Sequence, residues 1–460
     1  MRSFKKGLAL LLVLLMVATL FAACSGSKET NNNSSNSSKA SEVIIIKAQT
    51  KGGELTRVTN LEAAAEKLNE ELKAEGKNIT VKVEGTSFDG GWEDYRKQFI
   101  LAFQSGDEPD IFVAQHEELP WLAAGGYIIE LDDVRKSEAY ADVYQSLWPS
   151  VEWKGKTWGV PQDTEVRPIF YNKVALKKLG WTDEEIESLP EKAKNGEFTI
   201  RDMTKVAKEA KDKGIVQWGI THRPSNGIDF HMIAMNFGAD LYDEANDKLI
   251  FDKKPILETL KYFHDLTQVS KVTPEGMTQM EWKNIHKLNS QGEGLFWYGG
   301  IWNVFNWIKE AGANYDDILE NFGFMLVPPV ERGGKGMTLS HPLVYTISSK
   351  SEHPEIAKRL LELVTDAELQ VKHAVETTHL PINKSGANHE KFKKDRFLPT
   401  VTYMLDYTTF APNNENFTLY GSAFYKAIQE VEIGEKTPEE ALDFMEKQLK
   451  NDLGDNIIIK

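Results

Sequence analysis

Segments with the two-residue period of a β-strand alternate with segments of helical period along most of the chain. Apolar residues alternate or run together at 41–50, 78–86 and 110–114, which predicts three strands. Between the first two strands, residues 60–76 have helical periodicity and end at Gly76, a residue that favours the turn after a helix. Strands and helices in alternation predict an α/β fold.

Capping residues predict the ends of two later helices. Thr199 or its neighbour begins a helix that Gly214 ends, because a threonine side chain accepts a hydrogen bond from a free amide of the first turn. Near the C-terminus, Thr437 and Glu440 have the spacing of a capping box, and Pro438 stands at the first helical position. The alternation of strands and helices is therefore expected over most of the globular part.

The first 41 residues have the pattern of a targeting sequence followed by a linker. The apolar run 7–21 is too short to predict a membrane span, and Cys24, the only cysteine, follows small residues. This arrangement resembles the lipobox of bacterial lipoproteins, with Phe21 in place of the usual leucine. It implies a signal peptide over 1–23, a lipidated Cys24 and a protein that is extracytoplasmic and anchored to the cell membrane through its N-terminal lipid only. The polar, low-complexity stretch 24–41 predicts a flexible tether.

Size and charge narrow the classes of partner. The chain beyond the tether is longer than one hydrophobic core usually organises, which predicts two domains. The formal net charge is −15, and the leader is itself cationic, so the globular part is still more acidic. An acidic protein of this kind is repelled by nucleic acid and by anionic membrane surfaces and is expected to bind them poorly. With a single cysteine, no disulfide can form within the chain.

Motifs of the common enzyme classes are missing from the sequence. There is no G-x-S-x-G, no P-loop, no dinucleotide-binding glycine motif and no calcium loop. The sequence "QHEELP" begins like the zinc motif H-E-x-x-H but has Pro120 at the fifth position. We therefore expect no cofactor, no metal site and no catalytic residues.

Charged residues interrupt the strand-like segment 158–173, "WGVPQDTEVRPIFYNK". Because side chains of a strand alternate between its faces, Asp163, Glu165 and Arg167 are expected to point the same way. Two carboxylates at this spacing suit either glycosidase chemistry or the binding of sugar hydroxyls. Arg167 would favour the ionised form of both acids, whereas hydrolysis requires one carboxyl with a raised pKa.

Five segments, in order, resemble a known family. They are "FILAFQSGDEPDIFVA", "GKTWGVPQDTEVRPIFYNKVALKKLGW", "GLFWYGGIWNVFNWI", "FGFMLVPPV" and "YTISSKSEHPEIAKRLLELVTDAELQ". The chain resembles the extracellular solute-binding lipoproteins of bacterial ABC importers, the group that includes maltodextrin-binding protein. The resemblance covers nearly the whole globular part and implies a monomer that closes around a solute and delivers it to the transmembrane subunits of an ABC permease.

The resemblance also implies a two-lobed, type II periplasmic-binding-protein fold with several crossing strands and a cleft between the lobes. The expected N-terminal lobe combines residues 42–163 and 328–376. The expected C-terminal lobe combines residues 166–325 and 380–460. The segment 158–173 then lies where the chain first crosses, which places its charged side chains at the cleft.

Ligand-binding residues follow from the resemblance and from position. Glu165 and Tyr171 match sugar-contacting positions of the family, although a strand tyrosine is often a core residue. Trp302 and Tyr425 match aromatic platforms. The complete expected set adds residues beside these or after the strand 110–114, at the carboxyl end where open α/β sheets bind ligands: Asp163, Glu165, Arg167, Tyr171, Trp297, Trp302, Tyr425, Gln115 and His116.

Three functions remain open from the sequence. The main prediction is a receptor for a mono- or oligosaccharide. A polyol or a phosphorylated, inositol-like polyol is the alternative within the binding class, since Arg167 can meet a phosphate. A secreted glycoside hydrolase that uses Asp163 and Glu165 is the alternative from another class.

Overall fold

The computed structural model describes residues 42–460, and these form one compact unit. The predicted signal peptide, the tether and Cys24 lie outside the described residues. Among residues 42–460, no helix combines the length and the apolar character that a membrane span requires.

A five-stranded sheet organises the half of this unit that contains β1. Its strands lie in the order β2 (Ile79–Phe88), β1 (Glu42–Lys51), β3 (Ile111–Gln115), β14 (Leu343–Ile347) and β6 (Val160–Pro161). Strand β1 runs parallel to β2 and β3, whereas β14 runs antiparallel to β3 and β6. The helices of this half are α2 (Thr56–Ala74), α3 (Trp92–Ser105), α4 (Leu119–Ala124), α5 (Asp132–Arg135) and α15 (Pro354–Leu363).

A four-stranded sheet organises the other half. Its order is β12 (Phe322–Met325), β7 (Ile169–Asn172), β11 (Gly294–Tyr298) and β8 (Trp218–Thr221). A smaller sheet joins β16 (Ile457–Ile459), β10 (Lys248–Phe251) and β9 (Tyr242–Asp243). The helices are α6 (Lys173–Leu179), α7 (Asp183–Glu187), α8 (Leu189–Lys194), α9 (Ile200–Asp212), α10 (Asp229–Asn236), α11 (Lys253–His264), α12 (Trp282–Ser290), α13 (Asn303–Ala311), α14 (Tyr315–Asn321), α20 (Phe417–Glu432) and α21 (Pro438–Leu453).

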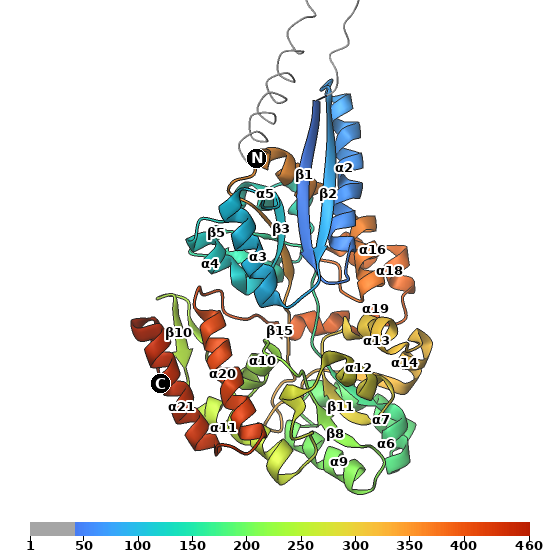
Figure 1. The fold of residues 1–460 in the computed structure, drawn as a ribbon. Coiled ribbons are helices and arrows are strands. Elements are labelled where there is room, and N and C mark those ends of the chain that lie inside the picture. The colour runs from blue at the N-terminus through green and yellow to red at the C-terminus, as the bar shows by residue number, and fades with distance from the viewer. Residues whose placement is uncertain (1–41) are drawn as a thin grey trace, which may run out of the picture. The chain divides into compact units, whose positions relative to one another are not determined.

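The chain passes between the two sheets more than once, and Figure 1 shows β1–β3 and β8/β11 in separate halves. Residues 162–168 join β6 to β7, and β13 (Thr338–Leu339) lies on the return from β12 to β14. A third passage follows α16 (Ala367–Thr377), where Leu380 forms a bridge with Thr164 of the first passage. The remaining helices, α17 (Lys384–Asn388), α18 (Glu390–Lys394) and α19 (Leu398–Val401), lead from there to β15 (Thr408–Thr409). The α/β, two-lobed prediction is confirmed, whereas the lobe boundaries stay a prediction.

Separate apolar cores support the two halves. Ile46, Phe112 and Leu360 are fully buried in a core around the first sheet. On one face of the second sheet, Ile220 and Phe424 belong to a core with α20 and α21, while Phe170 and Trp307 belong to a core on another side. Each half therefore has the buried apolar surface that stabilises a domain of its own.

The predicted helix ends are confirmed. Thr199 forms a capping box with Asp202 at the start of α9, and Thr437 forms one with Glu440 at the start of α21. The strand prediction for 158–173 holds only in part, because the residues between β6 and β7 belong to no sheet and form a single bridge, at Thr164. Their backbone groups are bonded to both halves instead, since the Gln162 amide donates to the Leu343 carbonyl and the Val166 carbonyl accepts from the Ile301 amide.

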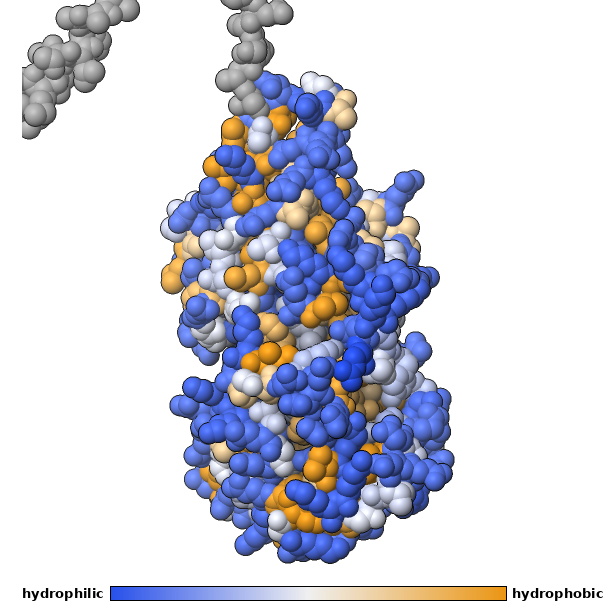
Figure 2. All heavy atoms as spheres, turned by 90° about the vertical axis from the view of Figure 1, so that its right-hand side faces the viewer, coloured by the Kyte–Doolittle hydropathy of each residue, from blue (hydrophilic) through white to orange (hydrophobic). Residues whose placement is uncertain are grey.

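Hydrophilic residues predominate on the face drawn in Figure 2, and the hydrophobic ones occur in small separate groups. The most exposed large hydrophobic residues, Leu101 and Val269, are each 65% accessible and lie on different halves. Scattered apolar residues of this kind are normal for a soluble surface and do not define a docking patch.

Candidate functional site

Asp163, on the first crossing segment, is the centre of a buried ionic cluster. Its Oδ2 accepts hydrogen bonds from Arg57 Nη2 at 2.7 Å and Nε at 3.1 Å, and it lies 2.8 Å from His373 Nε2. Its Oδ1 accepts from the Leu343 amide at 3.2 Å. Arg57, near the start of α2, also forms an ion pair with Glu54. One carboxylate thus connects a helix and a strand of the first half with α16 through the crossing segment.

Arg167 is the centre of a second cluster, four residues further along. Its Nη1 donates to both carboxylate oxygens of Asp229 at 2.9 Å, and its Nη2 lies 3.1 Å from Glu165 Oε1. Arg223 forms a further ion pair with Asp229. The guanidinium carbon of Arg167 lies 4.4 Å from the ring centroid of Trp302, within the range of a cation–π contact.

The two carboxylates of the crossing segment have opposite pKa shifts. Burial opposes ionisation of Asp163, but Arg57 and the neighbouring histidines outweigh it and hold the pKa well below its usual range. At Glu165 burial is the largest effect and raises the pKa, although Arg167 opposes it. Arg167 thus favours the ionised form of Glu165 as expected, but desolvation outweighs it and the net pKa rises, while the charge of Asp163 is stabilised by Arg57.

Several buried polar atoms around the crossing segment have no hydrogen-bond partner among the described residues. They include Arg167 Nε and His116 Nε2, whereas Glu165 Oε1 makes no hydrogen bond of standard geometry but is ion-paired with Arg167 Nη2 at 3.1 Å. Glu165 Oε2, by contrast, accepts from the His341 amide at 3.0 Å. A buried polar atom without a partner costs about 1–3 kcal/mol, so these atoms are suited to a polar solute that supplies the missing bonds.

The predicted aromatic residues differ in how much of the ring is free. Trp302 is only partly buried, at the start of α13, and its ring lies parallel to that of His379, with centroids 6.1 Å apart. Tyr425 is also partly buried, and its hydroxyl donates to the Pro224 carbonyl at 2.8 Å. Both rings retain accessible surface for a ligand.

Trp297 and Tyr171 lie in apolar cores instead. Trp297 is 2% exposed and stacks on Trp307, with centroids 5.2 Å apart. Tyr171 is 3% exposed on β7, and its hydroxyl is 3.4 Å from the Ile186 carbonyl. These surroundings favour a packing role for both rings, and their predicted contact with a ligand stays untested.

Gln115 and His116 lie at the carboxyl end of β3, as predicted. Gln115 caps the short 3₁₀ helix His116–Glu118, in a capping box with Glu118. His116 is fully buried, and its Nδ1 lies 3.0 Å from Asn413 Oδ1. Burial lowers the pKa of His116 to about 4, so the ring is neutral at pH 7.

Arg57, His373 and Asn413 belong to the site but escape prediction from the sequence. Arg57 lies in the segment after the carboxyl end of β1, a parallel strand. Gln115 was predicted as a ligand-binding residue because it lies at such a strand end, and the same reasoning applies to Arg57. His373 lies in the middle of α16, and no local pattern separates it from other helical histidines.

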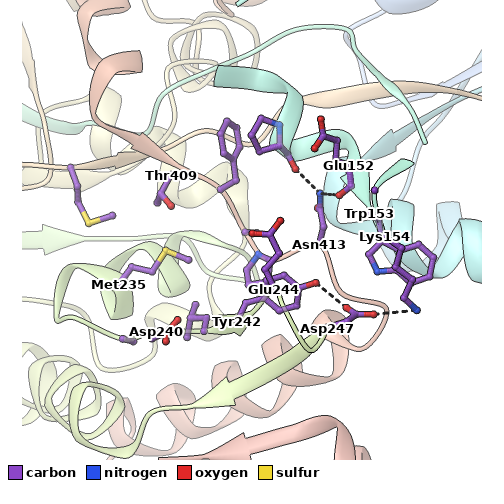
Figure 3. Close-up of a pocket in the computed structure, with 18 residues that line it drawn as sticks. Glu152, Trp153, Lys154, Met235, Asp240, Tyr242, Glu244, Asp247, Thr409 and Asn413 are labelled. Carbon is purple, nitrogen blue, oxygen red and sulfur yellow. Dashed lines mark hydrogen bonds and ion pairs between the residues drawn. The ribbon is translucent and has the colours of Figure 1, made fainter. Parts of the chain in front are cut away.

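A cavity of about 650 Å³ is lined in part by Asn413. Segments 149–155, 235–247 and 409–413 line it, and none of the nine predicted ligand-binding residues does. Figure 3 shows acidic and aromatic side chains around it, with Asp247 between Tyr242 and Lys154. Asn413 joins the cavity to His116.

The fold and the polar cluster define a two-lobed binding protein. The family model of bacterial extracellular solute-binding proteins matches residues 56–371, so the chain belongs to that family. It is 20% identical over 343 residues to a maltotriose-binding protein of Pyrococcus abyssi, covering 74% of this chain and 69% of the relative. It is 21% identical over 311 residues to a maltodextrin-binding protein of Bacillus subtilis, covering 67% and 69%.

Solved structures have the same fold. The sugar-binding protein MalE of Xanthomonas citri matches with a TM-score of 0.73 at 18% identity, over 90% of this chain and 98% of that one. Maltose-bound MalE3 of T. maritima matches with a TM-score of 0.72 at 20% identity, over 89% and 99%. The family and type II fold predicted from the sequence are confirmed.

Proposed function

We propose that this protein captures a mono- or oligosaccharide outside the cell and delivers it to the permease of an ABC transporter. The observation that supports this most is the incompletely paired guanidinium of Arg167, with its ion-pair partner Glu165, on a segment that joins both halves and next to the partly exposed ring of Trp302. The relatives named above are described as binding maltotriose and maltodextrin.

The chemistry of a sugar suits these groups. Vicinal hydroxyls can donate to a carboxylate oxygen such as Glu165 Oε1, and a hydrogen bond to a charged group is stronger than a neutral one. An aromatic face such as that of Trp302 can cover the apolar side of a sugar ring. Because contacts come from elements of both halves, solute binding would favour a closed arrangement of the lobes predicted at 42–163 with 328–376 and 166–325 with 380–460.

The arginines argue against a phosphorylated polyol as the preferred solute. Arg57 is shared between Glu54 and Asp163, and Arg167 between Glu165 and Asp229. A phosphate would have to displace one of these carboxylates or lie close to it. A neutral hydroxylated solute meets no such repulsion.

Hydrolysis is disfavoured by the state of Asp163, in spite of the raised pKa of Glu165. Asp163 accepts from Arg57, His373 and the Leu343 amide. A carboxylate held in this way is neither a free nucleophile nor a free base for water. We therefore propose a receptor without catalytic activity. The proposal also includes that it is a monomer and is anchored through a lipid on Cys24.

A thermal-shift screen tests the solute class. The purified protein is heated with mono- and oligosaccharides, polyols and their phosphates, and each added compound is then analysed by mass. A ligand at a hundred times its Kd stabilises the folded state by about 2.7 kcal/mol. We expect a shift with a neutral sugar that is recovered intact. A cleaved compound would establish a hydrolase, and a larger shift with a phosphorylated polyol would favour the alternative solute.

A pair of variants tests the site. Glu165→Gln removes the charge of the crossing-segment carboxylate, whereas Glu184→Gln does the same at an exposed position on α7. Since a hydrogen bond to a charged group is worth about 1.5–3 kcal/mol, Glu165→Gln should weaken sugar binding at least tenfold by calorimetry. Equal affinities for both variants would refute the proposed role of Glu165.

A further inference from the structure

We propose that His116, Glu117 and His341 form a binding site for a divalent transition-metal ion of the Zn²⁺ type. The three residues come from two strands that pair antiparallel, β3 and β14, in the register Leu343 opposite Gln115. The residues that follow Gln115 therefore meet those that precede Leu343, which brings His341 to His116 and Glu117. This inference does not depend on the identity of the solute.

The donor atoms of the three side chains converge. Glu117 Oε2 lies 2.6 Å from His341 Nε2 and 3.9 Å from His116 Nε2. One ligand atom from each residue lies within 4.8 Å of the others, and the residues are 0%, 9% and 8% exposed for His116, Glu117 and His341. Zinc bonds of about 2.0–2.2 Å place tetrahedral ligand atoms about 3.3 Å apart. Shifts on the order of an ångström would complete the geometry.

His116 is oriented as a metal ligand needs to be. Asn413 donates through Nδ2 to the carbonyls of Pro149, Ser150 and Glu152, at 2.9–3.0 Å, and part of this arrangement is visible in Figure 3. Its Oδ1 is thereby turned to His116 Nδ1, 3.0 Å away, and accepts the proton of that nitrogen.

The lone pair of His116 is consequently on Nε2. This atom is buried and has no hydrogen-bond partner among residues 42–460. Histidine ligands of metals typically donate their second ring N–H to an oxygen in this way, which fixes the tautomer. The unpartnered Nε2 is the observation that separates this cluster from an ordinary buried hydrogen-bond network.

The side-chain types also suit a cation. Two imidazole nitrogens and one carboxylate are a ligand set that zinc uses, with a fourth position left for water or another oxygen donor.

A second group of similar composition serves as a comparison. Asp163, His373 and His379 also place ligand atoms within 4.8 Å of one another. The guanidinium of Arg57 already donates twice to Asp163, however, and a cation there would meet like charge. We therefore assign the metal to the first cluster only.

The test uses the purified, chelator-treated protein without sugar. Zn²⁺ is titrated by calorimetry, and Co²⁺ is added as a spectroscopic probe. We expect one Zn²⁺ per chain, a visible Co²⁺ band of the tetrahedral type, and no competition by Mg²⁺, which prefers oxygen ligands. Absence of binding to the unmodified protein, or effective competition by Mg²⁺, would overturn the assignment. Sugar affinity is measured separately, so a failure here leaves the proposed function intact.

Variants locate the ion. Glu117→Gln and His341→Asn should each weaken Zn²⁺ binding at least tenfold and abolish the Co²⁺ band, whereas His353→Asn, outside the cluster, should change neither. Thermal melting of each variant in the absence of metal shows whether it is folded. The proposal is refuted if the folded variants Glu117→Gln and His341→Asn bind Zn²⁺ as well as the unmodified protein does. It is also refuted if His353→Asn loses Zn²⁺ binding to the same extent as they do, because either result places the ion elsewhere.

Discussion

Replacement of Arg57 by methionine should reveal how strongly the crossing segment depends on one buried ion pair. Arg57 is 2% exposed and donates two hydrogen bonds to Asp163, which is 1% exposed. Removal of one partner leaves a buried charge uncompensated, which costs about 3–5 kcal/mol. As the matched control, Arg359→Met removes a guanidinium that pairs with Glu71 and Glu75 but is 27% exposed, and such pairs contribute about 0–1 kcal/mol.

The free energy of unfolding is measured by urea denaturation, followed by tryptophan fluorescence. In the unmodified protein the lowered pKa of Asp163 adds stability that is lost only as the pH falls below the unfolded value of about 3.9. Without Arg57, burial should raise this pKa, so protonation relieves the penalty and the deficit of Arg57→Met should shrink between pH 7 and pH 4. A loss within about 1 kcal/mol of the control, or a deficit independent of pH, would refute the reasoning.

Three further predictions concern other parts of the molecule. Glu432 is the buried ion-pair partner of His222 and raises the pKa of that histidine. Glu432→Gln should therefore destabilise the protein most at low pH, where His222 is charged, and the loss should disappear as the pH rises through the raised pKa. Urea denaturation at pH 6 and above measures this dependence. Tyr171→Phe should leave sugar affinity unchanged in calorimetry, because the ring is packed in a core; a tenfold loss would make Tyr171 a ligand residue. Thr437→Ala should cost about 1 kcal/mol by removing the cap of α21, and an unchanged midpoint in urea would contradict that.

Local features of the fold follow from the sequence because their causes are local. The capping boxes at Thr199 and Thr437 depend on side chains three residues apart, and the strands and helices depend on periodicity within short windows. The alternation of predicted strands and helices was sufficient to predict an α/β fold. Five segments in the family's order together imply the two-lobed fold, and the match to residues 56–371 confirms the family.

Only the tertiary structure decides which charges meet. Asp163 and Arg167 are close in the sequence, yet Asp163 pairs with Arg57 and Arg167 with Asp229, more than sixty residues away on each side. The pKa of Glu165 rises because of burial, which depends on how the two halves close around the crossing segment and not on its neighbours in the chain. In the same way, the strand register that brings His341 to Glu117 joins residues that are 224 positions apart in the sequence. Sequence periodicity determines which faces are buried, whereas long-range contacts determine what each buried charge finds there.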